Sequence, residues 1–221
     1  MAIGAGSAEA GGPRSIKDEP YGGIVWTGFY AGLQAGYGWS NSRYSDEGYF
    51  SENNPDGFIG GAYAGYNYQL RNGLVLGLDA DIVRSGMEGS DGQRYLDDPS
   101  ISIAGVESEL EVRWSGALRA RIGYAAGRFL PYIAGGVSLA RYDFRWLDHV
   151  NGTVPFERSE TRIGWNIGAG FEYAISDRVT VRAEYRYSDF GTNHIPNDWA
   201  GPLTKIELET HDVRLGVAYR F

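Results

Sequence analysis

The sequence predicts an all-β fold, an eight-stranded antiparallel up-and-down transmembrane β-barrel. Three observations support this prediction. Apolar and polar residues alternate with period two from Trp26 onward, which indicates strands with two unlike faces. Tight turns alternate with long connections along the chain. Glycine, with 33 of 221 residues, and tyrosine, with 16, are both abundant, as in closed, curved sheets with aromatic residues at membrane interfaces.

The composition excludes several other classes. The chain has no cysteine, so it has neither disulfides nor thiolate metal sites. Its net charge of −8 argues against nucleic acid as a partner. No run approaches the roughly 20 apolar residues of a transmembrane helix. The mean hydropathy of −0.34 is typical of soluble proteins, but in a membrane barrel only every second residue meets lipid.

Two segments are predicted. Residues 1–25 are rich in glycine, alanine and proline without periodicity, which favours a flexible N-terminal segment. Within it, Ser7-Ala8-Glu9-Ala10 resembles the end of a signal-peptide cleavage site; a chance run of small residues is the equal alternative. Residues 26–221 form the predicted barrel.

The first four predicted strands span residues 27–40, 58–70, 74–84 and about 110–124. Their apolar faces consist of every second residue, beginning in that order at Phe29, Phe58, Leu74 and Leu110. The opposite faces hold glycine and polar residues. This alternation is the reason for predicting strands rather than helices.

The last four predicted strands span residues 129–144, 161–174, 179–190 and about 206–221. Their apolar faces begin in that order at Ile133, Ile163, Val179 and Val213. The alternation blurs near Tyr142, where a β-bulge would account for it.

The connections differ in length from one to the next. Residues 71–73, 125–128 and 175–178 are tight, and Asn72-Gly73 is a strong hairpin signal because both residues tolerate a positive φ. The other connections, residues 41–57, 85–109, 145–160 and 191–205, are predicted to be long loops. Outer-membrane barrels have short periplasmic turns and long extracellular loops.

The sequence of a water-soluble barrel would also alternate, but its apolar face would line the interior. The sequence therefore has to indicate whether the apolar face points inward or outward. Charges of both signs lie in mid-strand on the glycine-bearing face, where arginines and carboxylates can pair inside a narrow barrel. The apolar stretches run about 9–11 residues, which is the length that crosses a bilayer. The predicted ion-pair network of the barrel interior, or lumen, consists of Asp79, Asp81, Arg113, Arg119, Arg121, Glu172, Arg182, Glu184, Arg186 and Arg214.

Tyrosine and tryptophan concentrate near strand ends on the apolar face, where amphipathic rings suit the bilayer interfaces. The predicted interface aromatics are Tyr37, Trp39, Tyr66, Tyr68, Trp114, Tyr124, Trp165, Tyr173, Tyr185, Tyr187 and Tyr219.

No catalytic, cofactor or metal site is predicted. Asp79 and Asp81 share a strand face, but with arginines nearby a structural ion-pair network outweighs a catalytic pair. A hydrolase on the barrel wall would need a serine, a histidine and an acid together. His211 is the only histidine predicted on the wall, and no serine obviously partners it.

The chain resembles a known family. Residues 26–32, Trp-Thr-Gly-Phe-Tyr-Ala-Gly, and 35–39, Ala-Gly-Tyr-Gly-Trp, are similar to the opening strand of small outer-membrane β-barrel proteins. These are the porin-family surface proteins of alphaproteobacteria, related in architecture to the OmpA membrane domain and OmpX. Residues 64–69 and 119–124 also fit, and the resemblance covers residues 26–221.

The resemblance implies location in the bacterial outer membrane, contact with lipid and lipopolysaccharide, and no shared enzymatic activity. Val217, Tyr219 and Phe221 resemble the C-terminal signal read by the outer-membrane assembly machinery. Carboxylates of the long loops, such as Asp46, Glu47, Asp97 and Asp98, keep those loops soluble or bridge divalent cations to lipopolysaccharide phosphates.

The predicted function is a structural or surface-interaction role with a packed, ion-paired lumen: membrane integrity, lipopolysaccharide contact and loop-mediated binding. Two alternatives remain open, namely a small-solute channel and an adhesin or ligand-uptake protein.

Overall fold

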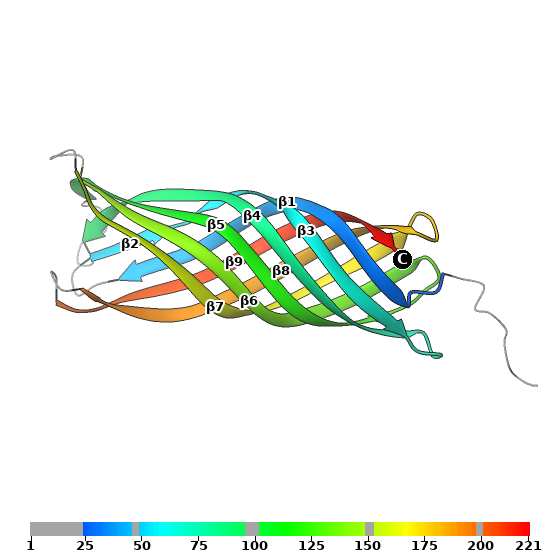
Figure 1. The fold of residues 1–221 in the computed structure, drawn as a ribbon. Coiled ribbons are helices and arrows are strands. Elements are labelled where there is room, and N and C mark those ends of the chain that lie inside the picture. Colours follow the sequence, from blue (N-terminus) through cyan, green and yellow to red (C-terminus); the bar gives the residue numbers. More distant parts are fainter. Residues whose placement is uncertain (1–23, 46–48, 96–101, 149–152, 198–200) are drawn as a thin grey trace, which may run out of the picture.

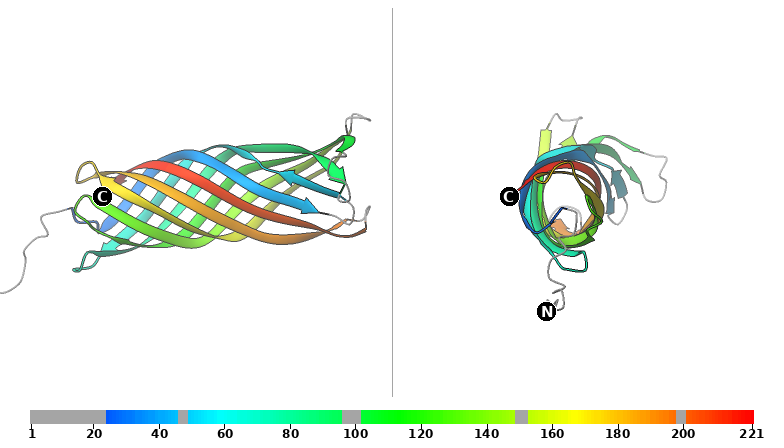
Figure 2. Two further views of the ribbon diagram at one scale, coloured as in Figure 1. Left: turned by 180° about the vertical axis from the view of Figure 1, so that it is seen from behind. Right: turned by 90° about the vertical axis from the view of Figure 1, so that its right-hand side faces the viewer.

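The strands form one closed antiparallel barrel. The structure, a computed structural model, describes residues 24–45, 49–95, 102–148, 153–197 and 201–221. Eight long strands follow each other around the barrel, and β1 pairs with β9 to close it (Figures 1 and 2). They are β1 (Gly28–Ser45), β3 (Asp56–Gln69), β4 (Leu74–Tyr95), β5 (Ser102–Tyr124), β6 (Phe129–Asp148), β7 (Thr153–Ala174), β8 (Val179–Asn197) and β9 (Gly201–Arg220). The predicted fold class is confirmed.

The strands are longer than predicted, and this is a correction to the loop assignments. Residues 41–45, 85–95, 102–109, 145–148, 153–160, 191–197 and 201–205 belong to strands rather than loops. A short extra strand, β2 (Tyr49–Asn53), pairs with β1 and β4. The physical reason is that beyond the belt the outer face meets water instead of lipid, so polar outward residues such as Glu88 weaken the apolar alternation while backbone pairing continues.

The tight connections lie together at one end of the barrel, the turn end, which also holds the C-terminus (Figure 1). The predicted Asn72-Gly73 hairpin is present: Gly73 has a φ of 86°, and the Leu74 amide donates to the Asn72 side chain at 3.1 Å. The described residues include no helix that is long and apolar enough to cross a membrane.

The outer surface carries an apolar belt. On β6 the outward positions from Phe129 to Leu139 bear no charge, and Ile133 and Val137 are more than half exposed. The first charged outward residue is Arg141. With about 3.4 Å per residue and a strand tilt near 40°, these positions span about 26 Å along the barrel axis. The belt therefore matches the height of a hydrocarbon core.

A β-bulge on β5 changes which side chains face inward, and it overturns the prediction for Arg113. Relative to β6, β5 has one extra residue between Val112 and Trp114. Val112 consequently points into the lumen and is 1% exposed, although it was predicted on the outer face. Arg113, predicted in the lumen, has a 48% exposed side chain and pairs with Asp143 on the outer surface. The bulge lies opposite Tyr142, where the sequence pattern blurs.

Candidate functional site

The barrel interior contains a charge-balanced cluster, here called the lumen network. Five buried arginines, Arg119, Arg121, Arg182, Arg186 and Arg214, lie among five buried carboxylates, Asp79, Asp81, Glu172, Glu184 and Asp212. Their formal charges therefore sum to zero. Nine of these ten residues are among those predicted from the sequence.

Arg119 lies at the centre of the lumen network. Its guanidinium donates two hydrogen bonds to Asp79, at 2.8 and 3.0 Å, and two to Glu184, at 2.7 and 3.0 Å. The register places Arg119 of β5 directly opposite Asp79 of β4, whereas Glu184 reaches it from β8. Its side chain is 0% exposed. Paired, planar contacts of this kind are the strong form of the arginine–carboxylate interaction.

A second layer lies on the side away from the turns. Asp81 accepts hydrogen bonds from Arg186 at 2.8 and 3.2 Å and from Arg214 at 2.9 Å. Arg214 also binds both oxygens of Asp212, two residues away on the same face of β9. Arg186 further contacts Glu184 at 3.0 Å, which joins this layer to Arg119.

A third layer lies toward the turns, and in it tyrosine side chains take the place of some of the carboxylates as partners of arginine. Arg121 donates to Glu172 at 2.7 Å and to the Tyr30 hydroxyl at 3.0 Å. Its guanidinium lies 3.9 Å from the Tyr132 ring centroid, and Arg182 lies 3.5 Å from that of Tyr63. Cations over aromatic faces are stabilised when desolvated.

Glycines make room for these long side chains. A Cβ on Gly77 would lie 2.9 Å from the Cγ of Arg121, and a Cβ on Gly216 would lie 3.2 Å from the Cγ of Arg182. Both distances are too short or tight for a side chain at these positions. The glycine-rich inner face thus serves the packing of the arginines.

The turn end of the lumen is closed by an apolar cluster of Trp26, Val75, Leu130 and Ala174, each at most 1% exposed. The Trp26 indole donates to the Gly127 carbonyl at 3.2 Å, and its backbone amide donates to Gln69 at 2.7 Å. Trp26 precedes the first strand, so period two gave no sign that it fills the barrel.

The opposite end, the loop end, is narrowed by a second apolar cluster of Met87, Val112, Ala140, Tyr142, Phe190 and Leu208. The Tyr142 and Phe190 rings meet edge-on with centroids 5.7 Å apart. Burial raises the pKa of the Tyr142 hydroxyl well above its usual range, so this group stays neutral.

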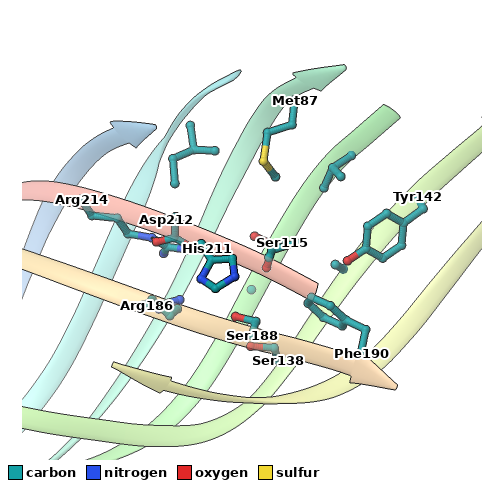
Figure 3. A pocket seen from close by; sticks show the side chains of 15 residues that line it. Met87, Ser115, Ser138, Tyr142, Arg186, Ser188, Phe190, His211, Asp212 and Arg214 are labelled. Atoms are coloured by element: carbon teal, nitrogen blue, oxygen red, sulfur yellow. Dashed lines mark hydrogen bonds and ion pairs between the residues drawn. The ribbon is translucent and has the colours of Figure 1, made fainter. Parts of the chain in front are cut away.

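A small cavity lies between this cluster and the lumen network. Figure 3 shows Arg186, Asp212 and Arg214 on one side, Met87, Tyr142 and Phe190 on the other, and serines between them. Its volume of about 20 Å³ holds one or two water molecules. A cavity of this size admits no organic solute.

The predicted interface aromatics all lie on the outer surface, in two groups. Tyr66, Tyr68, Tyr124, Tyr173 and Tyr219 lie toward the turn end, and Tyr37, Trp39, Trp114, Trp165, Tyr185 and Tyr187 lie toward the loop end. Trp39 stacks on His211 with centroids 5.7 Å apart, and the Tyr185 hydroxyl lies 2.7 Å from the His211 Nδ1. Two aromatic girdles around an apolar belt are a feature of transmembrane barrels.

Comparison with known proteins agrees with this geometry. A family model described as "Outer membrane protein beta-barrel domain" matches residues 19–221. The chain belongs to this family. It is 33% identical to the 31 kDa outer-membrane immunogenic protein of Brucella melitensis biotype 1, over 95% of this chain and 89% of that protein. It is 32% identical to the 25 kDa outer-membrane immunogenic protein of Brucella abortus biovar 1, over 89% and 79%.

Among solved structures, the outer membrane protein OprG of Pseudomonas aeruginosa has a similar fold. Its TM-score is 0.50, at 13% identity, with 88% of this chain and 96% of OprG covered. The resemblance to the outer-membrane barrel family and the predicted location in the bacterial outer membrane are confirmed by the family match and these relatives.

A hydrolase site on the barrel wall would need His211 to contact a serine and an acid. Its imidazole hydrogen-bonds to a tyrosine and stacks on a tryptophan, and no described contact joins it to a serine. Among the described residues, no three histidines or carboxylates gather as metal ligands would. The Brucella relatives are named as immunogenic proteins rather than enzymes.

The remaining predictions divide by position. Val217, Tyr219 and Phe221 are exposed on the outer surface at the turn end, with Phe221 at 79%. Asp46, Glu47, Asp97, Asp98 and residues 1–23 lie outside the described residues, so the predictions for them stay predictions. Asp212 was missed, although its position two residues from Arg214 on one strand face was a usable signal.

Proposed function

We propose that this outer-membrane barrel has a structural and surface-interaction role and that its lumen does not conduct. The observation that carries the proposal is the filling of the lumen. Five arginines and five carboxylates occupy its middle, and apolar clusters lie at both ends. An eight-stranded barrel is just wide enough for side chains to fill it.

The outer surface supports the membrane part of this role. The apolar belt and its two aromatic girdles fix the barrel in the bilayer, and the strands continue beyond the belt at the loop end. Since the turns of outer-membrane barrels face the periplasm, the extended strands face the cell exterior. Contact with lipopolysaccharide and recognition of the C-terminal residues by the assembly machinery are parts of the same proposal.

The test is conductance across a planar lipid bilayer. Folded, purified protein is inserted, and heat-modifiable gel mobility shows in parallel that the barrel is folded. We expect no stable unit currents, because the lumen network and both clusters block the passage. Stable, large unit currents would contradict the proposal and favour the small-solute channel.

The adhesin or ligand-uptake alternative rests on a different observation. β5 continues through Ser102, well beyond the belt position of Trp114, so that sheet stands above the membrane. Replacing residues 149–152 with a short glycine–serine linker tests it. Loss of binding to a host surface with unchanged heat-modifiable mobility would favour this alternative over a purely structural role.

A further inference from the structure

The outer surface carries a row of three side chains at the edge of the belt nearest the loop end, namely Arg84, Trp114 and Arg141. The register pairs Arg84 of β4 with Trp114 of β5, and Trp114 with Arg141 of β6. Both arginines are exposed. Since neighbouring strands lie about 4.8 Å apart, their Cα atoms are about 10 Å from each other. Two arginine side chains span this gap easily, so both guanidinium groups can reach one ligand.

The two arginines lack the neutralising partners that other arginines have. Every arginine of the lumen network contacts a carboxylate, and outside the barrel Arg113 pairs with Asp143. Within the described part of the chain, neither Arg84 nor Arg141 has an ion-pair or hydrogen-bond partner. Their charges are therefore available to a ligand.

The surroundings indicate what kind of ligand fits. The next row toward the turn end is Ile82, Gly116 and Leu139, of which Ile82 is 58% exposed and Leu139 is 40% exposed. Gly116 places no side chain between these two apolar residues. A lipid whose anionic head group lies beside the arginines would thus place its acyl chain toward the turn end, against this apolar wall.

The opposite side of the barrel has the other charge at this level. There the first charged outward residues are Asp189 and Glu209, which lie opposite each other on β8 and β9. At the belt edge itself, an anionic lipid would meet arginines on β4 and β6 but carboxylates on β8 and β9. The carboxylates Glu88 and Glu111 of β4 and β5 lie farther toward the loop end, where Arg113 is 3.9 Å from Glu111. The charge at the belt edge therefore favours the β4–β6 face.

We infer that Arg84 and Arg141, with Trp114 between them, bind the phosphate of a phosphorylated glycolipid of the outer leaflet. Arginine matches phosphate oxygens with paired N–H donors, and its aliphatic stem lies along apolar surface while the head stays at the interface. This inference rests on the lipid-contact part of the proposed function and assigns it to one place on the wall.

The experiment uses the full folded chain in neutral phosphatidylcholine nanodiscs, titrated with bisphosphorylated lipid A and, separately, with the same lipid after removal of both phosphates. Bound lipid is counted by native mass spectrometry. We expect the phosphorylated lipid to bind at least tenfold more tightly. The affinity of the double variant R84Q/R141Q should be at least tenfold lower than that of the wild type. R84K/R141K keeps both charges but not the paired N–H donors, so its loss should be smaller than that of R84Q/R141Q.

The matched control is R71Q/R178Q, which removes two charges at the turn end and should bind as the wild type does. Heat-modifiable mobility shows that each variant is folded. Equal binding of both lipids, or unchanged binding by R84Q/R141Q, would overturn the inference. Displacement of lipid A by an equal concentration of inorganic phosphate would also overturn it, because the site would then be a general anion site. None of these results depends on whether the lumen conducts.

Discussion

Replacing Arg119 with methionine measures how strongly the lumen network holds the barrel together. Methionine keeps an unbranched side chain but removes four hydrogen bonds and one buried positive charge. Glu184 would keep Arg186 and Tyr132, whereas Asp79 would keep an ion pair only with Arg182, at 3.6 Å. Removing one partner of a buried ion pair costs about 3–5 kcal/mol, because the other charge stays buried without compensation.

The assay is urea-induced unfolding in lipid vesicles, followed by tryptophan fluorescence and gel mobility. We expect R119M to lower the free energy of unfolding by about 3–5 kcal/mol. The double variant R119M/D79N restores four arginines against four carboxylates and should recover at least half of the loss. Arg128→Met, at a half-exposed arginine whose ion pair with Asp177 measures 3.9 Å, should cost no more than about 1 kcal/mol. An R119M barrel as stable as the Arg128→Met barrel would refute this reasoning.

Three further predictions test the wall, the sheet and the turn end by the same unfolding assay. Leu118→Arg places a charge in the middle of the belt and should lower the free energy of unfolding by about 2–4 kcal/mol. Thr161→Arg at the belt edge should lower it by less than about 1 kcal/mol. Equal losses would contradict the assigned belt. Gly36→Ala should destabilise the barrel, because its Cβ would lie 2.1 Å from the Val213 carbonyl oxygen. Gly60→Ala is the control, since its Cβ would lie 3.8 Å from the nearest atom. A larger loss of stability for Gly60→Ala than for Gly36→Ala would be inconsistent with the packing. Trp26→Ala should cost about 3–5 kcal/mol as a buried large-to-small change, and a loss below about 1 kcal/mol would show that Trp26 does not close the lumen.

Period two predicts the part of the fold that lies inside the bilayer. There lipid on one side and packed charges on the other force side chains to alternate, so Leu76 and Leu78 face outward while Asp79 and Asp81 face inward. Beyond the belt the outer face meets water, so outward residues such as Glu88 can be charged and the apolar alternation weakens. The residues after Arg84 were therefore predicted as a loop, although β4 continues to Tyr95.

Two features of the candidate site could not be obtained from alternation. The bulge at Arg113 shifts the pattern by one residue, and only the pairing of β5 with β6 reveals it. Trp26 fills the lumen from outside any strand, and its burial depends on contacts with Leu130 and Val75, far away in the sequence.

The central claim is that the apolar side of the sheet faces hydrocarbon and the charged side faces the lumen. Since the chain has no cysteine, single cysteines at the outward positions Leu118, Ala120 and Ile122 and at the inward position Ala117 can be offered a fluorescent label in vesicles that contain brominated lipid. The account predicts labelling with strong quenching at residues 118, 120 and 122, and labelling of residue 117 only after the barrel is unfolded. Labelling of residue 117 in the folded barrel, with quenching as strong as at residue 118, would contradict it.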